Sequence, residues 1–154
     1  MDKPIAIITG ASTGIGQSLS VKLSEQYLVY LISRNQDNLN KTKQLINAQN
    51  NECKVIVSDI SKTESINDIY SKIENKEKIE LLINNAGIGI FKNITDTTIK
   101  DWDNTIHTNL RGSFLMTKMV VDNLKSKKNG KIVFISSVAG IQPYKNSTAY
   151  VASK

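Results

Sequence analysis

The sequence contains few residues that restrain a chain covalently or bind a metal through sulfur. Among its 154 residues there is one cysteine, Cys53, together with two prolines, one tryptophan and one histidine. A single cysteine excludes an intramolecular disulfide and a cysteine-based zinc cluster. We therefore expect no metal site, and we expect Cys53 to be a small apolar filler where a strand begins.

Long apolar segments are also missing. No run approaches the roughly 18 residues that a membrane-spanning helix requires, and the first residues lack the basic, apolar and small-residue regions of a secretory signal. These absences predict a cytoplasmic protein with no membrane partner. The composition is otherwise ordinary, with 40% hydrophobic and 22% charged residues, which is typical of a globular protein. At this length we expect a single domain, residues 1–154.

Arginine is the scarce basic residue. The net charge is +6, yet only Arg34 and Arg111 are arginines, and the other basic residues are lysines. The densest lysine group lies at 125–131, where no aromatic residue is interleaved to stack on bases. We predict a solvated surface and no nucleic-acid partner. The alternative, a nucleic-acid binder, stays open and predicts a steep salt dependence of affinity.

Short apolar runs alternate with amphipathic segments along the chain. The runs predict strands at 5–8, 28–32, 54–57, 79–83 and 132–135. Apolar residues at helical spacing predict helices at 15–23, 39–48, 66–73 and 99–124, the last with Ile106, Leu110 and Phe114 on one stripe. Because the strands are continuously apolar, both faces of the sheet are expected to be covered. The pattern predicts an α/β protein with a Rossmann-like, doubly wound parallel sheet that stops after its fifth strand.

The first predicted strand runs into Thr-Gly-Ala-Ser-Thr-Gly-Ile-Gly at 9–16. A phosphate bound there needs backbone N–H groups with no Cβ in the way, and the positive end of a helix dipole. Gly10, Gly14 and Gly16 meet these needs between a strand and a helix, which is the context of a dinucleotide-binding turn. No Gly-Lys-Ser/Thr follows, so the turn is not a P-loop.

The end of the second strand is where such proteins read the adenosine ribose. An acidic residue there binds the 2′-hydroxyl of NAD, whereas an arginine accommodates the 2′-phosphate of NADP. Arg34 stands 20 residues after Gly14, and the nearest acidic residue, Asp37, is already in the next turn. The sequence therefore predicts NADP as the cofactor, with NAD the less favoured one.

Tyr150 and Lys154 are candidates for acid–base chemistry. Because they are four residues apart, they are neighbours on one face of a helix. An unperturbed tyrosine has a pKa of about 10, too high for proton transfer at neutral pH. A nearby ammonium favours the phenolate and lowers that pKa. The pair therefore predicts proton transfer by Tyr150, assisted by Lys154.

With these motifs in this order, the sequence resembles the short-chain dehydrogenase/reductase family. The family pattern is matched by Asp59 after the third strand, Asn-Asn-Ala-Gly at 84–87, Asn109 in the long helix and Ser137 after the fifth strand. Ser136 is adjacent to Ser137, and because side chains alternate at a strand end only one of the two faces the site. The family match favours Ser137. The resemblance implies a catalytic set made of Asn109, Ser137, Tyr150 and Lys154. It implies cofactor contacts from Gly10, Ser12, Thr13, Gly14, Ile15, Gly16, Arg34, Asp59, Ile60, Asn85, Ala86, Gly87, Tyr150 and Lys154.

The resemblance also implies an activity, namely NADP(H)-dependent hydride transfer between nicotinamide and a small-molecule carbonyl or alcohol. The substrates left open are 3-oxoacyl thioesters, small ketones, sugars and steroids. Family members continue beyond the Tyr-x-x-x-Lys motif, so we expect the chain to be an N-terminal part of a longer protein that forms a homo-oligomer, a dimer or a tetramer. A non-catalytic NADP-binding scaffold or sensor, or an inactive fragment, are the alternatives.

Overall fold

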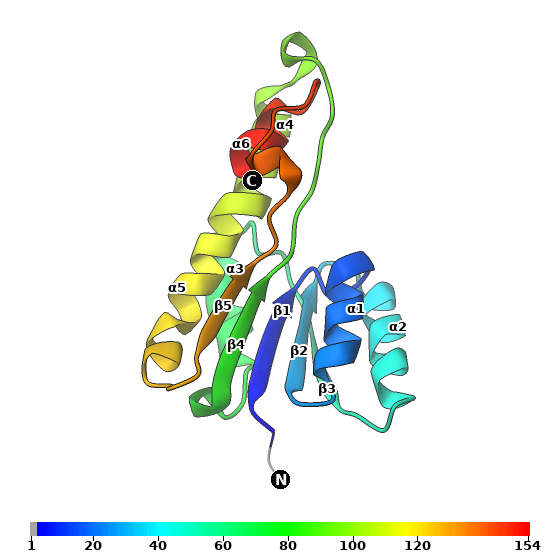
Figure 1. Ribbon diagram of the computed structural model, residues 1–154, viewed down its shortest axis with the longest axis vertical. Helices are drawn as coiled ribbons and strands as arrows, with labels where there is room; N and C mark the ends of the chain where they lie inside the picture. The colour runs from blue at the N-terminus through cyan, green and yellow to red at the C-terminus, as the bar shows by residue number, and fades with distance from the viewer. Residues whose placement is uncertain (1–2) are drawn as a thin grey trace.

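The computed structural model describes residues 3–154 and contains a parallel sheet between two layers of helices (Figure 1). Its strands are β1 (Ile5–Thr9), β2 (Leu28–Ser33), β3 (Cys53–Val57), β4 (Ile79–Asn84) and β5 (Lys131–Phe134). Its α-helices are α1 (Gly14–Leu23), α2 (Gln36–Asn47), α3 (Thr63–Ser71), α4 (Ile99–Ile106), α5 (Gly112–Lys125) and α6 (Thr148–Ser153). Met1 and Asp2, part of the segment searched for a secretory signal, lie outside the described residues.

The strand order explains where a ligand can bind. The sheet runs β3-β2-β1-β4-β5, and all neighbouring strands are parallel. The chain builds outward from β1 to β3 and then returns, so that β4 lies on the other side of β1. This reversal leaves a crevice at the carboxyl ends of β1 and β4, where doubly wound sheets bind their ligands. The predicted α/β fold class is confirmed.

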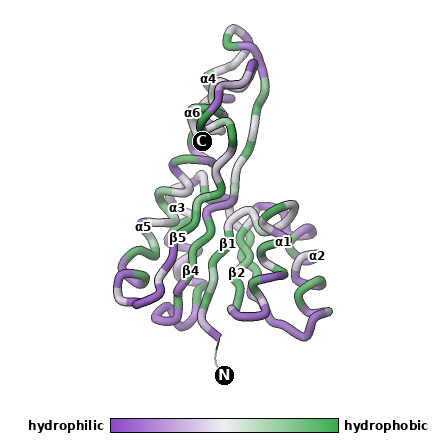
Figure 2. The backbone as a smooth tube through the Cα atoms, in the orientation of Figure 1, coloured by the Kyte–Doolittle hydropathy of each residue, from purple (hydrophilic) through white to green (hydrophobic). Residues whose placement is uncertain are grey.

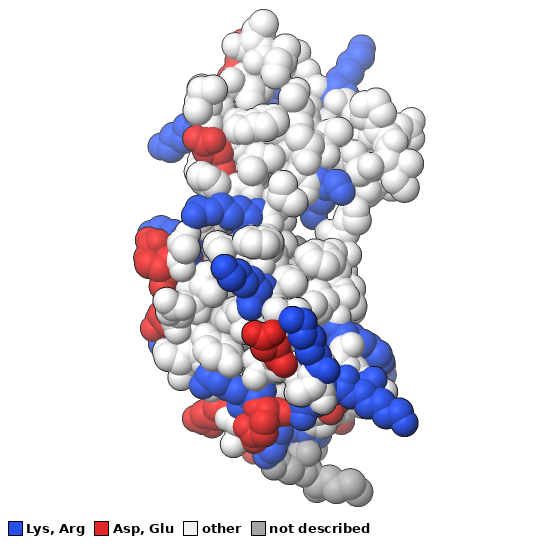
Figure 3. Space-filling view, turned by 90° about the vertical axis from the view of Figure 1, so that its left-hand side faces the viewer, with Lys and Arg blue, Asp and Glu red and all other residues white. Residues whose placement is uncertain are grey.

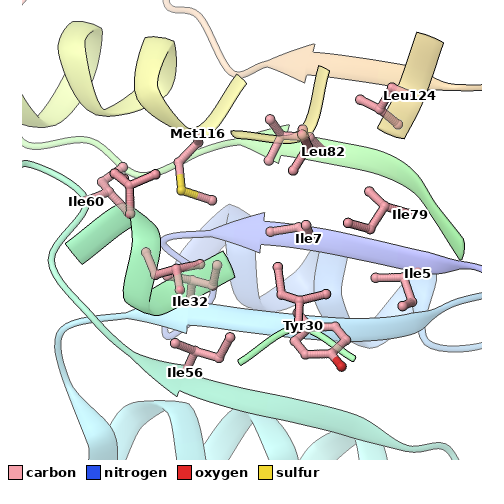
Figure 4. Close-up of a cluster of buried hydrophobic side chains, with 14 residues drawn as sticks. Ile5, Ile7, Tyr30, Ile32, Ile56, Ile60, Ile79, Leu82, Met116 and Leu124 are labelled. Carbon is pink, nitrogen blue, oxygen red and sulfur yellow. The ribbon is translucent and has the colours of Figure 1, made fainter. Parts of the chain in front are cut away.

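Alternating side chains along the strands build two cores. In β1, Ile5 and Ile7 join the cluster that contains residues of α3 and α5, whereas Ala6 and Ile8 join the cluster beneath α2. Figure 4 shows the first cluster, and the strands appear as hydrophobic stretches in the middle of Figure 2. Because β1 is buried on both faces, its run is continuously apolar, as predicted. Burying each such side chain contributes roughly 1.5–3 kcal/mol.

β5 is not buried on both faces, contrary to the prediction. Val133 and Phe134 are 39% and 57% exposed, and β5 is one of the two outer strands of the sheet, with β3 at the opposite edge. Contacts of α1 and α2 with the sheet go to β1, β2 and β3, so within residues 3–154 these helices leave β5 uncovered. The prediction of two covered faces holds for the inner strands and is wrong for β5.

The predicted helix at 99–124 is two helices joined by a different kind of turn. Residues His107–Arg111 form one π-helical turn between α4 and α5. A π turn takes up an extra residue and shifts the faces of the two flanking helices against each other. Leu110 and Phe114, placed by the sequence on one stripe with Ile106, are consequently 52% and 60% exposed.

The predicted start of α2 was three residues late. The helix begins at Gln36 because Asn35 precedes it as an N-cap. The Asn35 side-chain oxygen accepts a hydrogen bond from the backbone N–H of Asn38 at 2.8 Å. Such a cap satisfies an N–H group that has no partner within the helix.

Candidate active site

A cleft of about 340 Å³ lies at the carboxyl edge of the sheet, beside the crevice between β1 and β4. Its walls come from the segments that follow β1, β2, β3 and β4. The predicted cofactor residues that line it are Gly10, Ser12, Thr13, Ile15, Arg34, Asp59, Ile60, Asn85, Ala86 and Gly87. Gly14 and Gly16 lie in the first turn of α1 and are not among the lining residues. Residues predicted from four separate motifs are thus brought together in one cleft.

The turn after β1 has a backbone that only glycine accommodates well. Gly10 has a φ of +66°, in the left-handed region. A Cβ at Gly10 would lie 2.8 Å from the Cα of Ala86, and a Cβ at Gly16 would collide with the carbonyl oxygen of Gly10. Thr13, the N-cap of α1, makes no side-chain hydrogen bond to the first turn of that helix. The backbone N–H groups of this first turn therefore suit an anion at the helix N-terminus.

Thr9 ties this turn to the Asn-Asn-Ala-Gly segment. Its hydroxyl donates to the carbonyl of Ile83 at 3.3 Å and accepts from the backbone N–H groups of Asn85 and Ala86, both at 3.1 Å. The Asn85 amide in turn donates to the carbonyls of Thr9 and Gly10 at 3.0 and 3.2 Å. This network holds the two walls of the cleft at a fixed separation.

The end of the cleft at β2 carries one cation and two hydroxyls. Arg34 follows β2, is exposed and lines the cleft. The hydroxyls of Ser12 and Ser33 are hydrogen-bonded to each other at 2.9 Å beside it. Asp59, the one carboxylate among the lining residues, stands on the wall that follows β3 and accepts from the backbone N–H and the hydroxyl of Ser61 at 3.0 and 2.8 Å.

A second cavity of about 330 Å³ adjoins the cleft and contains the predicted acid–base pair. Tyr150 and Lys154 both line it, and it shares Ile15, Asn85 and Gly87 with the cleft. The Lys154 Nζ donates to the carbonyl of Ile135 at 2.8 Å and lies 5.8 Å from the centre of the Tyr150 ring. The predicted placement of the ammonium near the phenol ring, on one side of α6, is what the structure has.

An aromatic side chain forms the apolar wall of this second cavity. The ring of Phe91 packs against that of Tyr150 with centroids 5.6 Å apart and an interplanar angle of 55°. Its segment is held in place because the Lys92 N–H donates to the carbonyl of Asn146 at 2.7 Å. Phe91 is nevertheless 63% exposed, so its ring offers apolar surface to a molecule bound beside Tyr150.

Of the two serines after β5, Ser136 lines the second cavity and Ser137 does not. The Ser136 hydroxyl also lies 3.4 Å from the carbonyl oxygen of Lys154. Ser137, the predicted catalytic serine, begins the 3₁₀ turn Val138–Gly140, and its hydroxyl accepts from the N–H of Ala139 at 3.1 Å. A hydroxyl that accepts in this way still has its own O–H to donate.

Asn109 lies in the π turn and is buried. Its Oδ1 accepts from the N–H of Ile88, and its Nδ2 donates to the carbonyl of the same residue, both at 2.8 Å. The second proton of Nδ2 goes to the hydroxyl of Ser153 at 2.9 Å. The backbone carbonyl of Asn109 accepts a hydrogen bond from the Ser113 hydroxyl at 2.8 Å. Asn109 therefore links the segment after β4 to helix α6.

The described part of the chain contains neither a cluster of metal-ligating side chains nor a membrane-spanning helix. Residues 3–154 contain no group of three or more His, Cys, Asp or Glu side chains arranged to hold a metal ion. No helix in this range has the length and apolar character needed to cross a membrane. On the face drawn in Figure 3, lysines and arginines alternate with acidic residues over the lower half.

The sequence profile of the short chain dehydrogenase family matches residues 4–154. The chain belongs to this family. An uncharacterized oxidoreductase of Staphylococcus epidermidis is 32% identical over an alignment of 152 residues that covers 97% of this chain and 65% of the relative. A sepiapterin reductase of Chlorobaculum tepidum is 32% identical over 161 residues, covering 99% of this chain and 66% of the relative. The chain thus spans about two thirds of the length of these short-chain dehydrogenases.

A solved structure of the family is similar along the whole chain. It is a metagenomic short-chain oxidoreductase crystallised with NADP, with a TM-score of 0.92 and 30% sequence identity. The similarity covers 99% of this chain and 70% of that one. The Rossmann-like arrangement of sheet and helices is therefore the family arrangement.

Thr9 and Ser153, to which the sequence analysis assigned no role, take part in the site. Thr9 opens the recognised glycine motif, so its position was a usable signal. The part played by Ser153 was not predictable in this way, since it depends on a contact with Asn109, which is far away in the sequence.

Proposed function

We propose that this chain forms the nucleotide-binding part and the acid–base centre of an NADP(H)-dependent oxidoreductase acting on a carbonyl or alcohol. The observation that carries the proposal is the adjacency of the two cavities. The glycine-lined cleft ends at Arg34 on one side and meets the cavity of Tyr150 and Lys154 on the other. An extended dinucleotide laid along this path would place its reactive end beside the phenol.

The residues of the cleft suit NADP(H). The close packing at Gly10 and Gly16 leaves no room for a Cβ, so a ligand can approach the backbone after β1. The N-terminus of α1 follows this turn, and its N–H groups suit a pyrophosphate. Arg34, with no acidic residue at the end of β2, suits the 2′-phosphate that distinguishes NADP from NAD. The similar oxidoreductase crystallised with NADP supports the same choice. When bound, this cofactor supplies or accepts the hydride.

The protein's own part of the reaction is the movement of a proton. In carbonyl reduction the Tyr150 phenol donates its proton to the carbonyl oxygen, and in alcohol oxidation the phenolate takes the proton from the hydroxyl. The ammonium of Lys154 lies beside the phenol, 5.8 Å from the centre of the Tyr150 ring. The family pattern assigns the orientation of the substrate oxygen to Ser137, whose O–H remains able to donate. Ser136, which lines the cavity beside Tyr150, is placed to donate there as well. Asn109 completes the proposed catalytic set. The exposed ring of Phe91 favours substrates with an apolar substituent on the carbonyl.

We propose further that residues 1–154 form one domain of a cytoplasmic enzyme that assembles as a homodimer or homotetramer. Support for assembly comes from Leu110 and Phe114, which expose an apolar face on the π turn and α5. The cytoplasmic placement rests on the single, buried cysteine, which suits a reducing compartment.

Turnover of the full-length protein with NADPH and a panel of ketones, aldehydes and 3-oxoacyl thioesters tests the proposal. The Tyr150→Phe variant should bind NADPH with unchanged affinity while its turnover falls at least about a hundredfold, because the general acid is lost. Tyr27→Phe, which removes a phenol hydroxyl elsewhere in the chain, serves as the control and should match the parent. NADPH binding without turnover on any carbonyl would favour the scaffold or sensor instead. A Tyr150→Phe variant that kept most of the parent's turnover would disprove the assigned acid.

A further inference from the structure

Ser153, the residue before Lys154, is a buried hydroxyl with a donor and an acceptor contact. It is 8% exposed, and its Oγ donates to the carbonyl of Tyr150 at 2.8 Å. The same Oγ accepts from the Nδ2 of Asn109 at 2.9 Å in a buried hydrogen bond. One hydroxyl thus joins the backbone of the proposed acid to a side chain of the π turn.

The contact with Asn109 extends to the wall of the nucleotide cleft. Asn109 holds both the N–H and the carbonyl of Ile88, and Ile88 lines the cleft as well as the cavity of Tyr150. Gly87 lies beside this link, since a Cβ there would stand 3.4 Å from Asn109 Oδ1 and 3.5 Å from Lys154 Nζ. The chain of contacts from the cleft to α6 is continuous and passes through Ser153.

We propose that Ser153 is a positioning residue, whose hydroxyl fixes helix α6 and its Tyr150–Lys154 pair against the Ile88 segment of the nucleotide cleft. The inference rests on the proposed function in one respect, namely that Tyr150 and Lys154 act on a substrate. Ser153 itself touches neither the cofactor path nor the second cavity. Its effect is carried through the backbone of Tyr150 and the amide of Asn109.

The contact at Ser153 helps to set the orientation of α6. Helix α6 (Thr148–Ser153) packs against α4, and the hydrogen bond between Ser153 and Asn109 ties it to the π turn that follows α4. An alanine at 153 leaves one N–H of the buried Asn109 amide without its partner, which favours a shifted amide or a shifted helix. Displacements of about 1 Å at a reacting group can lower a rate by about a hundredfold.

The same helix offers a closely matched control. Ser147 is 1% exposed, and its hydroxyl donates to the carbonyl three residues earlier, that of Tyr144, at 2.6 Å. Ser153 donates to the carbonyl three residues earlier in the same manner. The two serines differ in that the second hydroxyl also meets Asn109. Alanine at 147 therefore reproduces the loss of a buried hydroxyl without breaking the link to the cleft.

The kinetic test compares Ser153→Ala, Ser153→Thr and Ser147→Ala in the full-length protein, with NADPH and the best carbonyl of the panel. We expect Ser153→Ala to lower kcat by about tenfold to a hundredfold, while KM for NADPH stays within about twofold, because the phosphate contacts lie elsewhere. Ser153→Thr keeps a hydroxyl and should restore most of kcat. Unchanged kcat in Ser153→Ala, or an equal loss in Ser147→Ala, would overturn the inference.

Hydrogen exchange gives a readout that does not depend on turnover. The Ile88 N–H, bonded to Asn109 Oδ1, should exchange about tenfold faster or more in Ser153→Ala. In Ser147→Ala its exchange should equal that of the parent. Equal protection of this N–H in Ser153→Ala and the parent would refute the link, even if the protein catalysed no reaction. Conversely, faster exchange in a protein without turnover would keep the link and reject the proposed function.

Discussion

At the scale of single residues, the two arginines of the chain have separate tasks. Arg111, in the π turn, donates to the hydroxyl of Thr63 at the start of α3. Arg34 lines the nucleotide cleft next to the Ser12–Ser33 hydroxyl pair. The first acidic residue after β2 is Asp37, inside the first turn of α2. Arg34 is the one cation among the lining residues, and the one carboxylate, that of Asp59, already accepts two hydrogen bonds from Ser61. A guanidinium so placed is suited to a phosphate.

Replacing Arg34 should therefore change the choice of cofactor. We expect Arg34→Ala to weaken NADPH binding about tenfold or more and to leave NADH binding nearly unchanged, since a hydrogen bond to a charged group contributes about 1.5–3 kcal/mol. Titrations of both cofactors into the full-length protein measure the change. Lys43→Ala removes a cation on α2 that does not line the cleft, and it should alter neither affinity. Equal affinities of the parent for NADPH and NADH would show that Arg34 does not select the phosphate.

At the scale of elements, the sequence was most informative where local chemistry alone decides the structure. The apolar runs located β1 to β4 to within one residue at each end, because buried parallel strands need continuous apolar side chains. The glycines at 10, 14 and 16 located the cleft, because positive φ and close backbone approach exclude other residues. The strand order then brings the predicted residues together around one crevice.

Elements whose form depends on tertiary contacts were not predictable. A π turn within a helical segment leaves no signal in the apolar pattern of the sequence. This turn is held by contacts of Asn109 with Ile88 and Ser153, which are far away in the sequence. The exposure of β5 depends on what lies over it and not on its own residues. The choice between Ser136 and Ser137 as a lining residue depends on how the chain turns after β5.

Helix α4 provides a pH-dependent element. Its N-cap Thr98 and the carboxylate of Asp101 form a reciprocal capping box, and Lys92 pairs with that carboxylate at 2.7 Å. The hydrogen bond from Lys92, followed by those from Thr98, lowers the pKa of Asp101 to about 2. Because the folded-state pKa lies below the ordinary value of 3.8, the ionised form stabilises the fold above that value, and the contribution is lost as the pH falls toward 2.

An Asp101→Ala variant should show this dependence. Its unfolding midpoint in urea should lie below that of the parent at pH 5 and above, where the carboxylate is ionised in both the folded and the unfolded chain. The gap should narrow as the pH falls from about 4 toward 2, where the parent loses the same interaction. Asp103→Ala, on the same helix but outside the capping box, is the control. A gap that stays constant over this pH range would show that the Asp101 charge does not stabilise α4.

At the scale of the whole molecule, the described chain has one side covered less well than the rest. Among residues 3–154, β5 pairs with β4 alone, so its outer edge carries backbone groups with no strand beside them. Val133 and Phe134 are exposed on this strand, with Leu110 and Phe114 exposed on the neighbouring helical layer. An apolar edge strand of this kind pairs readily with other chains, and residues 132–135 have the uncharged, β-rich character of aggregating segments.

The 154-residue chain expressed on its own should therefore associate and be poorly soluble. A charge placed on the edge strand blocks strand pairing, so Val133→Lys should raise the fraction of monomer, measured by size-exclusion chromatography with light scattering. Leu45→Lys adds the same charge at an exposed apolar position of α2, distant from the edge. It should leave the association unchanged, which separates an edge effect from an effect of net charge. If the unmodified chain is a monodisperse monomer, or if both lysine variants raise the fraction of monomer equally, the exposed edge of β5 is not what drives association.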